Sequence, residues 1–110
     1  LKLKINLIDQ SLFGVYPSFY DAFPLTLIEF YSRKKILLRS NISESVNFVN
    51  DSLLLIDPYN VDDICNKINR LLMLSNDDYI KLVNPLFNKT KNYDGGKLAY
   101  KINNFSNDIF

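Results

Sequence analysis

Two acidic residues, Asp21 and Glu29, have the spacing in this 110-residue chain that most suggests chemistry. Asp21 falls in a short loop, and Glu29 follows Pro24 by five positions. Proline suits the first turn of a helix because its missing N–H would have no intrahelical partner there. The sequence therefore predicts a helix that opens near Pro24, with Asp21 just before it and Glu29 about a turn and a half inside it.

The apolar run before this loop predicts a strand that ends where the loop begins. Residues 12–16 read as a buried strand, and Pro17-Ser18 ends it. The first turn of the following helix would offer unpaired backbone N–H groups, which together with the helix dipole attract an anion such as phosphate. Carboxylates beside such a site would accept hydrogen bonds from hydroxyls attached to the anion. Phosphate joined to hydroxyls suggests a nucleotide sugar.

Strands and helices alternate along the chain. Residues 3–10 predict a helix before the first strand, and the second helix should run from Pro24 to about Arg33. Two further short apolar strands are predicted at residues 36–38 and 53–56. Strands that alternate with helices in short units imply parallel pairing. We therefore expect an α/β fold with a parallel sheet and flanking helices.

Two capping signals predict the helices that follow. Asn60 should cap a helix with apolar residues at i, i+3 and i+4 spacing, and Asp63 would complete a capping box. Ser75 should cap the next helix, which we expect to be interrupted near Pro85 because proline removes a hydrogen bond and clashes with the preceding turn. The apolar face of the first of these helices is expected to consist of Val61, Ile64, Cys65, Ile68, Leu71 and Leu72.

The composition limits the classes of function. A formal charge of +1 gives no electrostatic case for nucleic-acid binding. No apolar run approaches the roughly 18 residues of a membrane span. The absence of histidine and the presence of one cysteine, Cys65, leave zinc sites without ligands and serine–histidine hydrolysis without a base. Cys65 excludes an internal disulfide, suits a reducing compartment, and is expected to be a small core residue.

The linked segments resemble the C-terminal, nucleotide-sugar-binding domain of retaining glycosyltransferases of family four, which have a B-type fold of two Rossmann-like domains. Members show a proline–serine pair, an acid, a glycine–phenylalanine pair and a glutamate eight residues after the acid, and then two strands of characteristic sequence. The order and spacing match over roughly residues 7–93. The matching segments of this chain are residues 16–29, 40–44 and 54–59.

The resemblance implies a role for each site residue. In the family, the second acid hydrogen-bonds the ribose of the donor, and its position is Glu29. The first acid lies beside the transferred sugar, and its position is Asp21, where most members carry the longer glutamate. Backbone N–H groups at the helix start hold the pyrophosphate. The resemblance thus implies Asp21 and Glu29 as the catalytic pair, and Phe23, Pro24, Leu25, Thr26 and Glu29 as donor-binding residues.

The chain departs from the family pattern at four positions. Ala22 stands where members carry the first glycine of the loop. Lys34 and Ile36 replace a glycine and a proline before the second strand, and Asn47 replaces a glutamate. The basic trio at residues 33–35 suits the C-terminus of a helix and is expected to be solvated. These substitutions leave the fold intact and put the activity in question.

The resemblance also implies an activity. It is transfer of a hexose from a UDP-, GDP- or ADP-sugar to a glycan or lipid hydroxyl with retention, without a bound metal or other cofactor. Such transfer serves polysaccharide, lipopolysaccharide or glycolipid synthesis, in the cytoplasm or at the inner face of the membrane. Because the chain begins at Leu1 and is too short for two domains, we expect residues 1–93 to be part of the donor domain, with residues 94–110 forming a terminal helix after the break at residues 94–96. The missing N-terminal domain would leave this part inactive or a weak nucleotide binder.

Two other classes stay open. The chain could be a non-catalytic, glycosyltransferase-like half-domain that acts as a binding or interaction module, and an exposed apolar patch where further strands should pack would support this reading. It could also be an unrelated flavodoxin-like α/β domain, such as a phosphate-binding receiver. That reading needs acidic clusters at the ends of the early strands, where only Asp9 and Asp21 occur.

Overall fold

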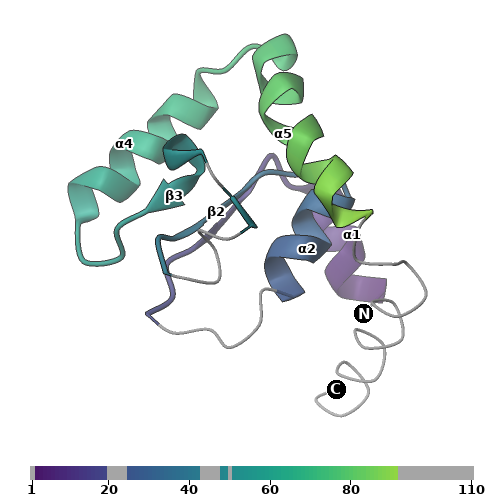
Figure 1. Ribbon diagram of the computed structural model, residues 1–110, viewed down its shortest axis with the longest axis horizontal. Helices are drawn as coiled ribbons and strands as arrows, with labels where there is room; N and C mark the ends of the chain where they lie inside the picture. The colour runs from purple at the N-terminus through teal and green to yellow at the C-terminus, as the bar shows by residue number, and fades with distance from the viewer. Residues whose placement is uncertain (1, 20–24, 43–47, 50, 92–110) are drawn as a thin grey trace.

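The computed structural model describes residues 2–19, 25–42, 48–49 and 51–91, and within these residues the chain forms a parallel sheet flanked by helices (Figure 1). This α/β architecture was predicted from the alternation of strands and helices, and it is compatible with a Rossmann-like fold. The described elements are α1 (Lys2–Gln10), β1 (Gly14–Tyr16), α2 (Leu25–Ser32), β2 (Leu37–Ser40), the 3-10 helix η1 (Ser52–Leu54), β3 (Leu55–Ile56), α4 (Val61–Leu72) and α5 (Asn76–Thr90).

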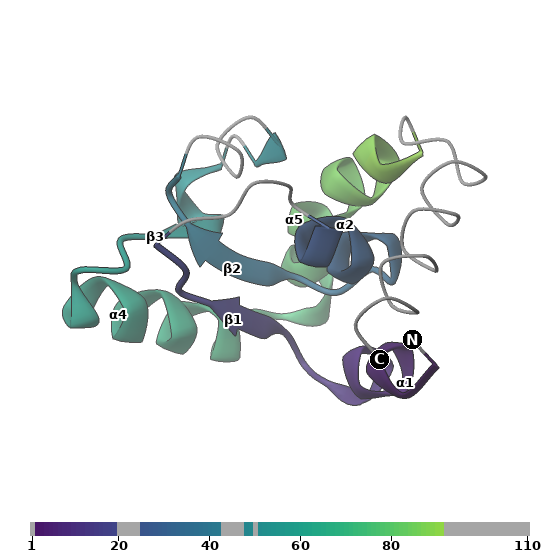
Figure 2. The same cartoon turned by 90° about the horizontal axis from the view of Figure 1, so that it is seen from below.

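The sheet has three described strands in the order β1-β2-β3, so β2 lies in the middle (Figure 2). Both pairings are parallel: Gly14 lies opposite Leu37 between β1 and β2, and Arg39 lies opposite Leu55 between β2 and β3. A parallel pair needs a crossover connection, which α2 provides between β1 and β2. The carboxyl ends of all three strands therefore share one edge of the sheet.

The core lies where α2, β2, β3, α4 and α5 meet. Phe30 of α2 packs so closely on β1 that a Cβ built on Gly14 would lie 2.5 Å from its ring. A side chain at position 14 would therefore force the Phe30 ring or the Leu37 side chain to shift. The buried core residues are Leu27, Ile28, Tyr31, Ile36, Leu37, Leu38, Phe48, Val49, Leu54, Leu55, Ile56, Leu71, Val83 and Leu86.

The second and third strands differ in extent from the prediction. β2 begins at Leu37 and continues to Ser40, two residues past the predicted end. Of the predicted strand at residues 53–56, only Leu55 and Ile56 pair with a neighbour. The residues before them form η1 because the carboxylate of Asp51 accepts a hydrogen bond from the Leu53 N–H at 3.0 Å. This side-chain cap satisfies the backbone locally and competes with strand pairing.

The cap of α4 was predicted correctly, and the capping box was not. Asn60 Oδ1 accepts a hydrogen bond from the Asp63 N–H at 3.1 Å, as predicted. The Asp63 carboxylate does not return to the Asn60 N–H. It accepts from the Asp57 N–H at 2.8 Å, while the Asn60 N–H donates to the Asp57 carbonyl at 3.0 Å. Asp63 therefore ties α4 to the turn after β3.

Only part of the predicted apolar face of α4 is buried against the rest of the protein. Leu71 is buried and Ile64 and Ile68 are partly buried against the core, but Val61 is 71% exposed. Leu72 and Cys65 are also exposed, so the prediction that Cys65 fills the core is wrong. The reason is the short β3, whose two residues can cover only a narrow strip of the helix.

Helix α5 runs without interruption through Pro85, contrary to the prediction. Its start was predicted correctly, since Ser75 Oγ accepts a hydrogen bond from the Asp78 N–H at 3.2 Å. Pro85 is exposed, so the proline ring lies on the solvent side, where a carbonyl without an intrahelical partner can bond to water. The predicted break at residues 94–96 and the terminal helix lie outside the described residues.

Candidate functional site

The connection from β1 to α2 places the part of the predicted site that can be described. β1 ends at Tyr16, and α2 begins at Leu25, so Leu25 and Thr26 lie in the first helical turn and Glu29 in the second. Open α/β sheets bind their ligands outside the carboxyl ends of the strands, which is where α2 begins. The predicted residues Asp21, Ala22, Phe23 and Pro24, and the departure at Asn47, lie outside the described residues.

Glu29 is buried and paired on one of its two oxygens. Lys4 Nζ of α1 donates to Glu29 Oε1 at 3.0 Å, and the Glu29 side chain is only 5% exposed. Glu29 Oε2 is also buried and accepts no hydrogen bond from any residue that the structure describes. A buried carboxylate needs partners, and here one oxygen has a cation while the other has none among the described groups. Glu29 is therefore not the solvated helix residue that its charge alone would predict.

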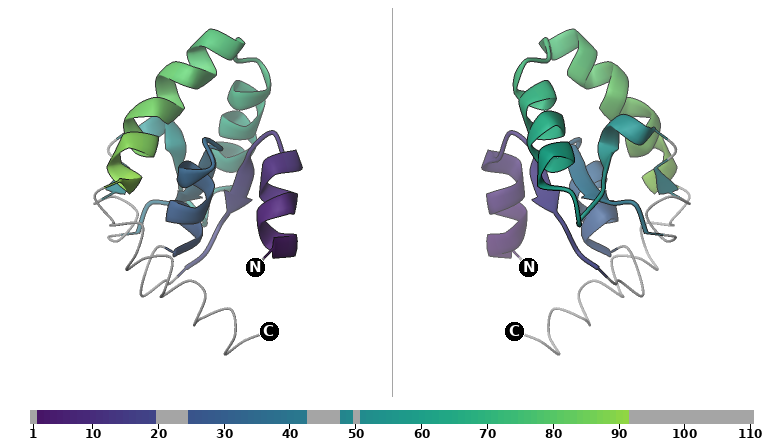
Figure 3. Two further views of the ribbon diagram at one scale, coloured as in Figure 1. Left: turned by 90° about the vertical axis from the view of Figure 1, so that its right-hand side faces the viewer. Right: turned by 90° about the vertical axis from the view of Figure 1, so that its left-hand side faces the viewer.

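A second ion pair joins α1 to the turn directly after α2. Arg33 Nε donates to Asp9 Oδ1 at 2.8 Å, and Arg33 Nη2 contacts Asp9 Oδ2. The hydrogen bond from Arg33 holds the pKa of the Asp9 carboxyl below its ordinary value. Lys4 pairs with Glu29 of α2, and Asp9, later on α1, pairs with Arg33, directly after α2. The two helices therefore run in the same direction (Figure 3). Arg33 is exposed, as expected of a solvated cap, and in addition pairs with Asp9 of α1 at the protein surface.

Lys34 has a backbone conformation that glycine normally adopts. Its φ is +57°, in the left-handed region, just after α2 ends. The Lys34 N–H donates to the Tyr31 carbonyl at 3.1 Å, and the Lys35 N–H donates to the Phe30 carbonyl at 2.9 Å. The chain thus turns from α2 toward β2 by a C-cap of the type that glycine commonly forms.

The sequence reasoning missed the polar groups that end β2. Arg39 is fully buried, and its guanidinium carbon lies 5.1 Å from the centre of the Tyr16 ring. Ser40 is also fully buried, and the hydroxyls of Ser40 and Ser18 make no hydrogen bond with the described residues. A charged residue directly after two strand leucines was the available signal. The carboxyl edge of the sheet therefore holds buried polar atoms from β2 and from Ser18, two residues after β1.

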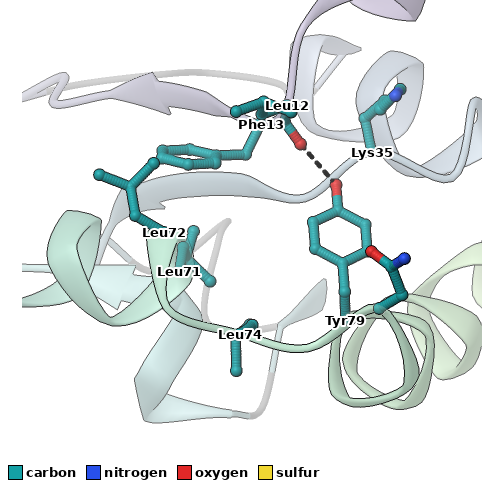
Figure 4. A pocket seen from close by; sticks show the side chains of 8 residues that line it. Leu12, Phe13, Lys35, Leu71, Leu72, Leu74 and Tyr79 are labelled. Carbon is teal, nitrogen blue, oxygen red and sulfur yellow. Dashed lines mark hydrogen bonds between the residues drawn. The ribbon is translucent and has the colours of Figure 1, made fainter.

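A pocket at the opposite edge of the sheet is built differently. It has a volume of about 270 Å³, and Tyr79 closes one side of it (Figure 4). The Tyr79 hydroxyl donates to the Leu12 carbonyl at 2.8 Å and accepts from the Ile36 N–H at 2.9 Å, so it joins the segments that lead into β1 and β2. Burial raises the pKa of Tyr79. The pocket lining is mainly apolar and consists of Leu12, Phe13, Lys35, Leu71, Leu72, Leu74, Asn76 and Tyr79.

The described part of the chain shows neither a metal-binding cluster nor a membrane-spanning helix. No group of three or more acidic, cysteine or histidine side chains is placed to hold a metal ion there. No described helix has both the length and the apolar character that crossing a membrane requires. Comparison with models of protein families, with curated proteins and with solved structures found no match. The resemblance to glycosyltransferases therefore rests on the residues of the chain itself.

Proposed function

We propose that this chain is the C-terminal part of the nucleotide-sugar-binding domain of a retaining, B-type glycosyltransferase. The proposal rests mainly on the burial of Glu29, an acidic residue on the second turn of the helix that follows a parallel strand. Its Oε2 accepts no hydrogen bond from the described residues. Leaving a buried acceptor without a donor costs about 1–3 kcal/mol, and a ligand hydroxyl that donates to Oε2 would remove this cost.

In the proposed binding mode, the ligand contacts α2 in two places, the Glu29 side chain and the backbone of the first turn. The ribose hydroxyls donate to Glu29, and the diphosphate lies against the backbone N–H groups of the first turn, at Leu25 and Thr26. As the hexose transfers to an acceptor hydroxyl, negative charge develops on the departing diphosphate. The helix N-terminus then stabilises this charge at the place where it forms. In this proposal Asp21, just before α2 in the sequence, lies beside the transferred hexose.

The end of α2 is also compatible with the proposal. Members of the similar family carry glycine at the position of Lys34, and the left-handed φ of +57° at Lys34 is the conformation that explains such a preference. A residue of left-handed conformation after α2 is compatible with the family pattern, even though the glycine itself is absent. The substitution changes the residue and keeps the turn.

The proposal assigns partners by chemistry. The donor is a UDP-, GDP- or ADP-hexose, and the acceptor is a hydroxyl of a glycan or lipid, bound by an N-terminal domain of the same protein. In the similar family, the phosphate-binding cations and the base-binding loop belong to other parts of the protein than the segment that this chain resembles. We therefore propose that the 110-residue chain alone binds nucleoside diphosphates weakly and transfers no sugar.

Chemical shifts of the backbone amides test this proposal. Labelled protein is titrated separately with UDP, GDP and ADP, since weak binding is still visible in the shifts. The proposal expects changes centred on Leu25, Thr26 and Glu29, with one base preferred. Changes centred on Leu71 and Tyr79 would place the nucleotide in the apolar pocket and contradict the proposal, as would a well-dispersed spectrum that none of the three nucleotides alters.

A second candidate, a non-catalytic interaction module, is favoured by exposed apolar side chains on α1 and β1. Leu3 and Leu7 lie one turn apart on α1 and are 71% and 60% exposed. Val15 is 37% exposed on β1, which pairs on only one side among the described strands. Edge strands with apolar neighbours recruit further strands. Sedimentation that shows self-association, and loss of it in Leu7→Gln, would support this candidate, whereas a monomer at all concentrations would count against self-assembly.

A further inference from the structure

We propose that Lys4 is a positioning residue for Glu29. In this proposal its ammonium holds Oε1, so that Oε2 keeps one direction and accepts a hydrogen bond from a ribose hydroxyl. The inference rests on the proposed function of Glu29 and adds a residue to it. Lys4 belongs to α1, precedes Glu29 by 25 residues, and lies outside the motif that suggested the site.

The geometry distinguishes the two oxygens of the Glu29 carboxylate. Lys4 Nζ lies 3.0 Å from Oε1, and Oε2 accepts no hydrogen bond from the described residues. The last torsion of a glutamate side chain is broad and roughly two-fold, so an unanchored carboxylate rotates easily. A cation on one oxygen restricts this rotation and fixes where the other oxygen points. The oxygen left over is the natural acceptor for a ligand.

The burial of the pair indicates how a hydroxyl reaches Oε2. Glu29 is 5% exposed, whereas the Lys4 side chain is 41% exposed and is the part of the pair that meets solvent. A lysine ammonium sits on a flexible four-carbon stem with three rotatable donors. The stem can therefore move aside for a ribose while Nζ stays on Oε1. Lys4 keeps its contact with Glu29 in both states.

The pair formed by Asp9 and Arg33 provides a matched control. It joins α1 to the residue directly after α2, about one helical turn beyond the pair of Lys4 and Glu29, and it does not include Glu29. If Lys4 only fastened α1 to α2, removing Lys4 or Arg33 would have similar effects on the site. If Lys4 positions the carboxylate, only the removal of Lys4 lowers the preference for nucleotides that carry ribose hydroxyls.

The experiment compares the affinity for UDP, GDP and ADP with that for their 2′,3′-dideoxy forms. The wild-type chain is compared with Lys4→Met, Lys4→Arg and Arg33→Met, each checked for native amide dispersion. We expect the wild type to prefer the ribose form about tenfold, the effect of one hydrogen bond to a charged group. Lys4→Met should lose most of this preference. Lys4→Arg, which restores a cation, and Arg33→Met should keep it.

Each other outcome overturns a defined part of this account. An unchanged ribose preference in Lys4→Met, or an equal loss in Arg33→Met, would overturn the positioning role and leave the proposed function standing. Tighter ribonucleotide binding by Lys4→Met would show that Lys4 competes with the ligand, which is also incompatible with the inference. A wild-type chain that binds none of the three nucleotides would overturn the proposed function and this inference together.

Discussion

The ring of Phe30 lies where a side chain on Gly14 would have to be. A Cβ built on Gly14 would come within 2.5 Å of Phe30 Cε1 and 2.8 Å of Leu37 Cδ1, both closer than real Cβ contacts. The absence of a side chain at residue 14 lets α2 pack directly on β1. The height of α2 above the sheet, and hence the place of Glu29, depends on this contact.

We therefore predict that Gly14→Ala destabilises the fold by about 1–3 kcal/mol, the usual cost of overpacking. Urea unfolding measures the effect. The double variant Gly14→Ala/Phe30→Leu should recover part of the loss relative to Phe30→Leu alone, because the smaller side chain leaves room for the methyl group. Wild-type stability in Gly14→Ala would mean that α2 packs less closely than described.

Tyr79→Phe removes a single oxygen atom and should destabilise the fold. The Tyr79 hydroxyl accepts from the Ile36 N–H and donates to the Leu12 carbonyl, so its removal leaves both backbone groups without this partner. We expect a loss of about 1–3 kcal/mol in the free energy of unfolding. Tyr59→Phe is the control, because Tyr59 is 83% exposed and should change stability by less than about 0.5 kcal/mol. Equal effects of the two variants would show that the Tyr79 bridge contributes little.

Asp63 should make stability depend on pH in the acid range. The hydrogen bond from the Asp57 N–H, aided by Lys67, holds the pKa of Asp63 below its ordinary value of 3.8. A folded-state pKa below the unfolded one gives stability that is fully present above the unfolded pKa and is lost as pH falls through the folded pKa.

The corresponding variant is Asp63→Asn, measured by thermal unfolding from pH 7 to pH 2. The stability difference from the wild type should be constant above about pH 5 and should shrink at lower pH, because protonation removes the advantage of the charged acceptor. Asp62→Asn removes a charge from the same helical turn without touching the Asp57 N–H. If both variants showed the same pH dependence, the cause would be the general charge of the turn and not the hydrogen bond.

Features set by neighbouring residues could be predicted from the sequence. Asn60 and Ser75 cap their helices through N–H groups three residues away, so the signal and its effect lie within one turn of chain. The start of α2 one residue after Pro24 follows from the conformational limits of proline in the same way. Parallel pairing followed from the order of strands and helices, which again needs no knowledge of side-chain contacts.

Features set by packing could not be predicted. The exposure of Cys65 depends on how much of α4 the short β3 covers, and the continuity of α5 depends on which side of the helix Pro85 occupies. The pairing of Glu29 with Lys4 requires α1 to dock beside α2 across 25 residues of chain. A lysine on a short amphipathic helix gives no local sign of such a partner.

The most direct test of the central claim is the affinity of Glu29→Gln for the nucleoside diphosphate that the wild type prefers. Glutamine keeps the shape of the side chain and removes the charge that a ribose hydroxyl would meet. Asp9→Asn is the control, because it weakens the other ion pair between α1 and α2 and leaves Glu29 in place. The account predicts a loss of about tenfold or more in Glu29→Gln and wild-type affinity in Asp9→Asn. Wild-type affinity in Glu29→Gln would contradict the assignment of Glu29 as the acceptor for the ribose of a nucleotide sugar.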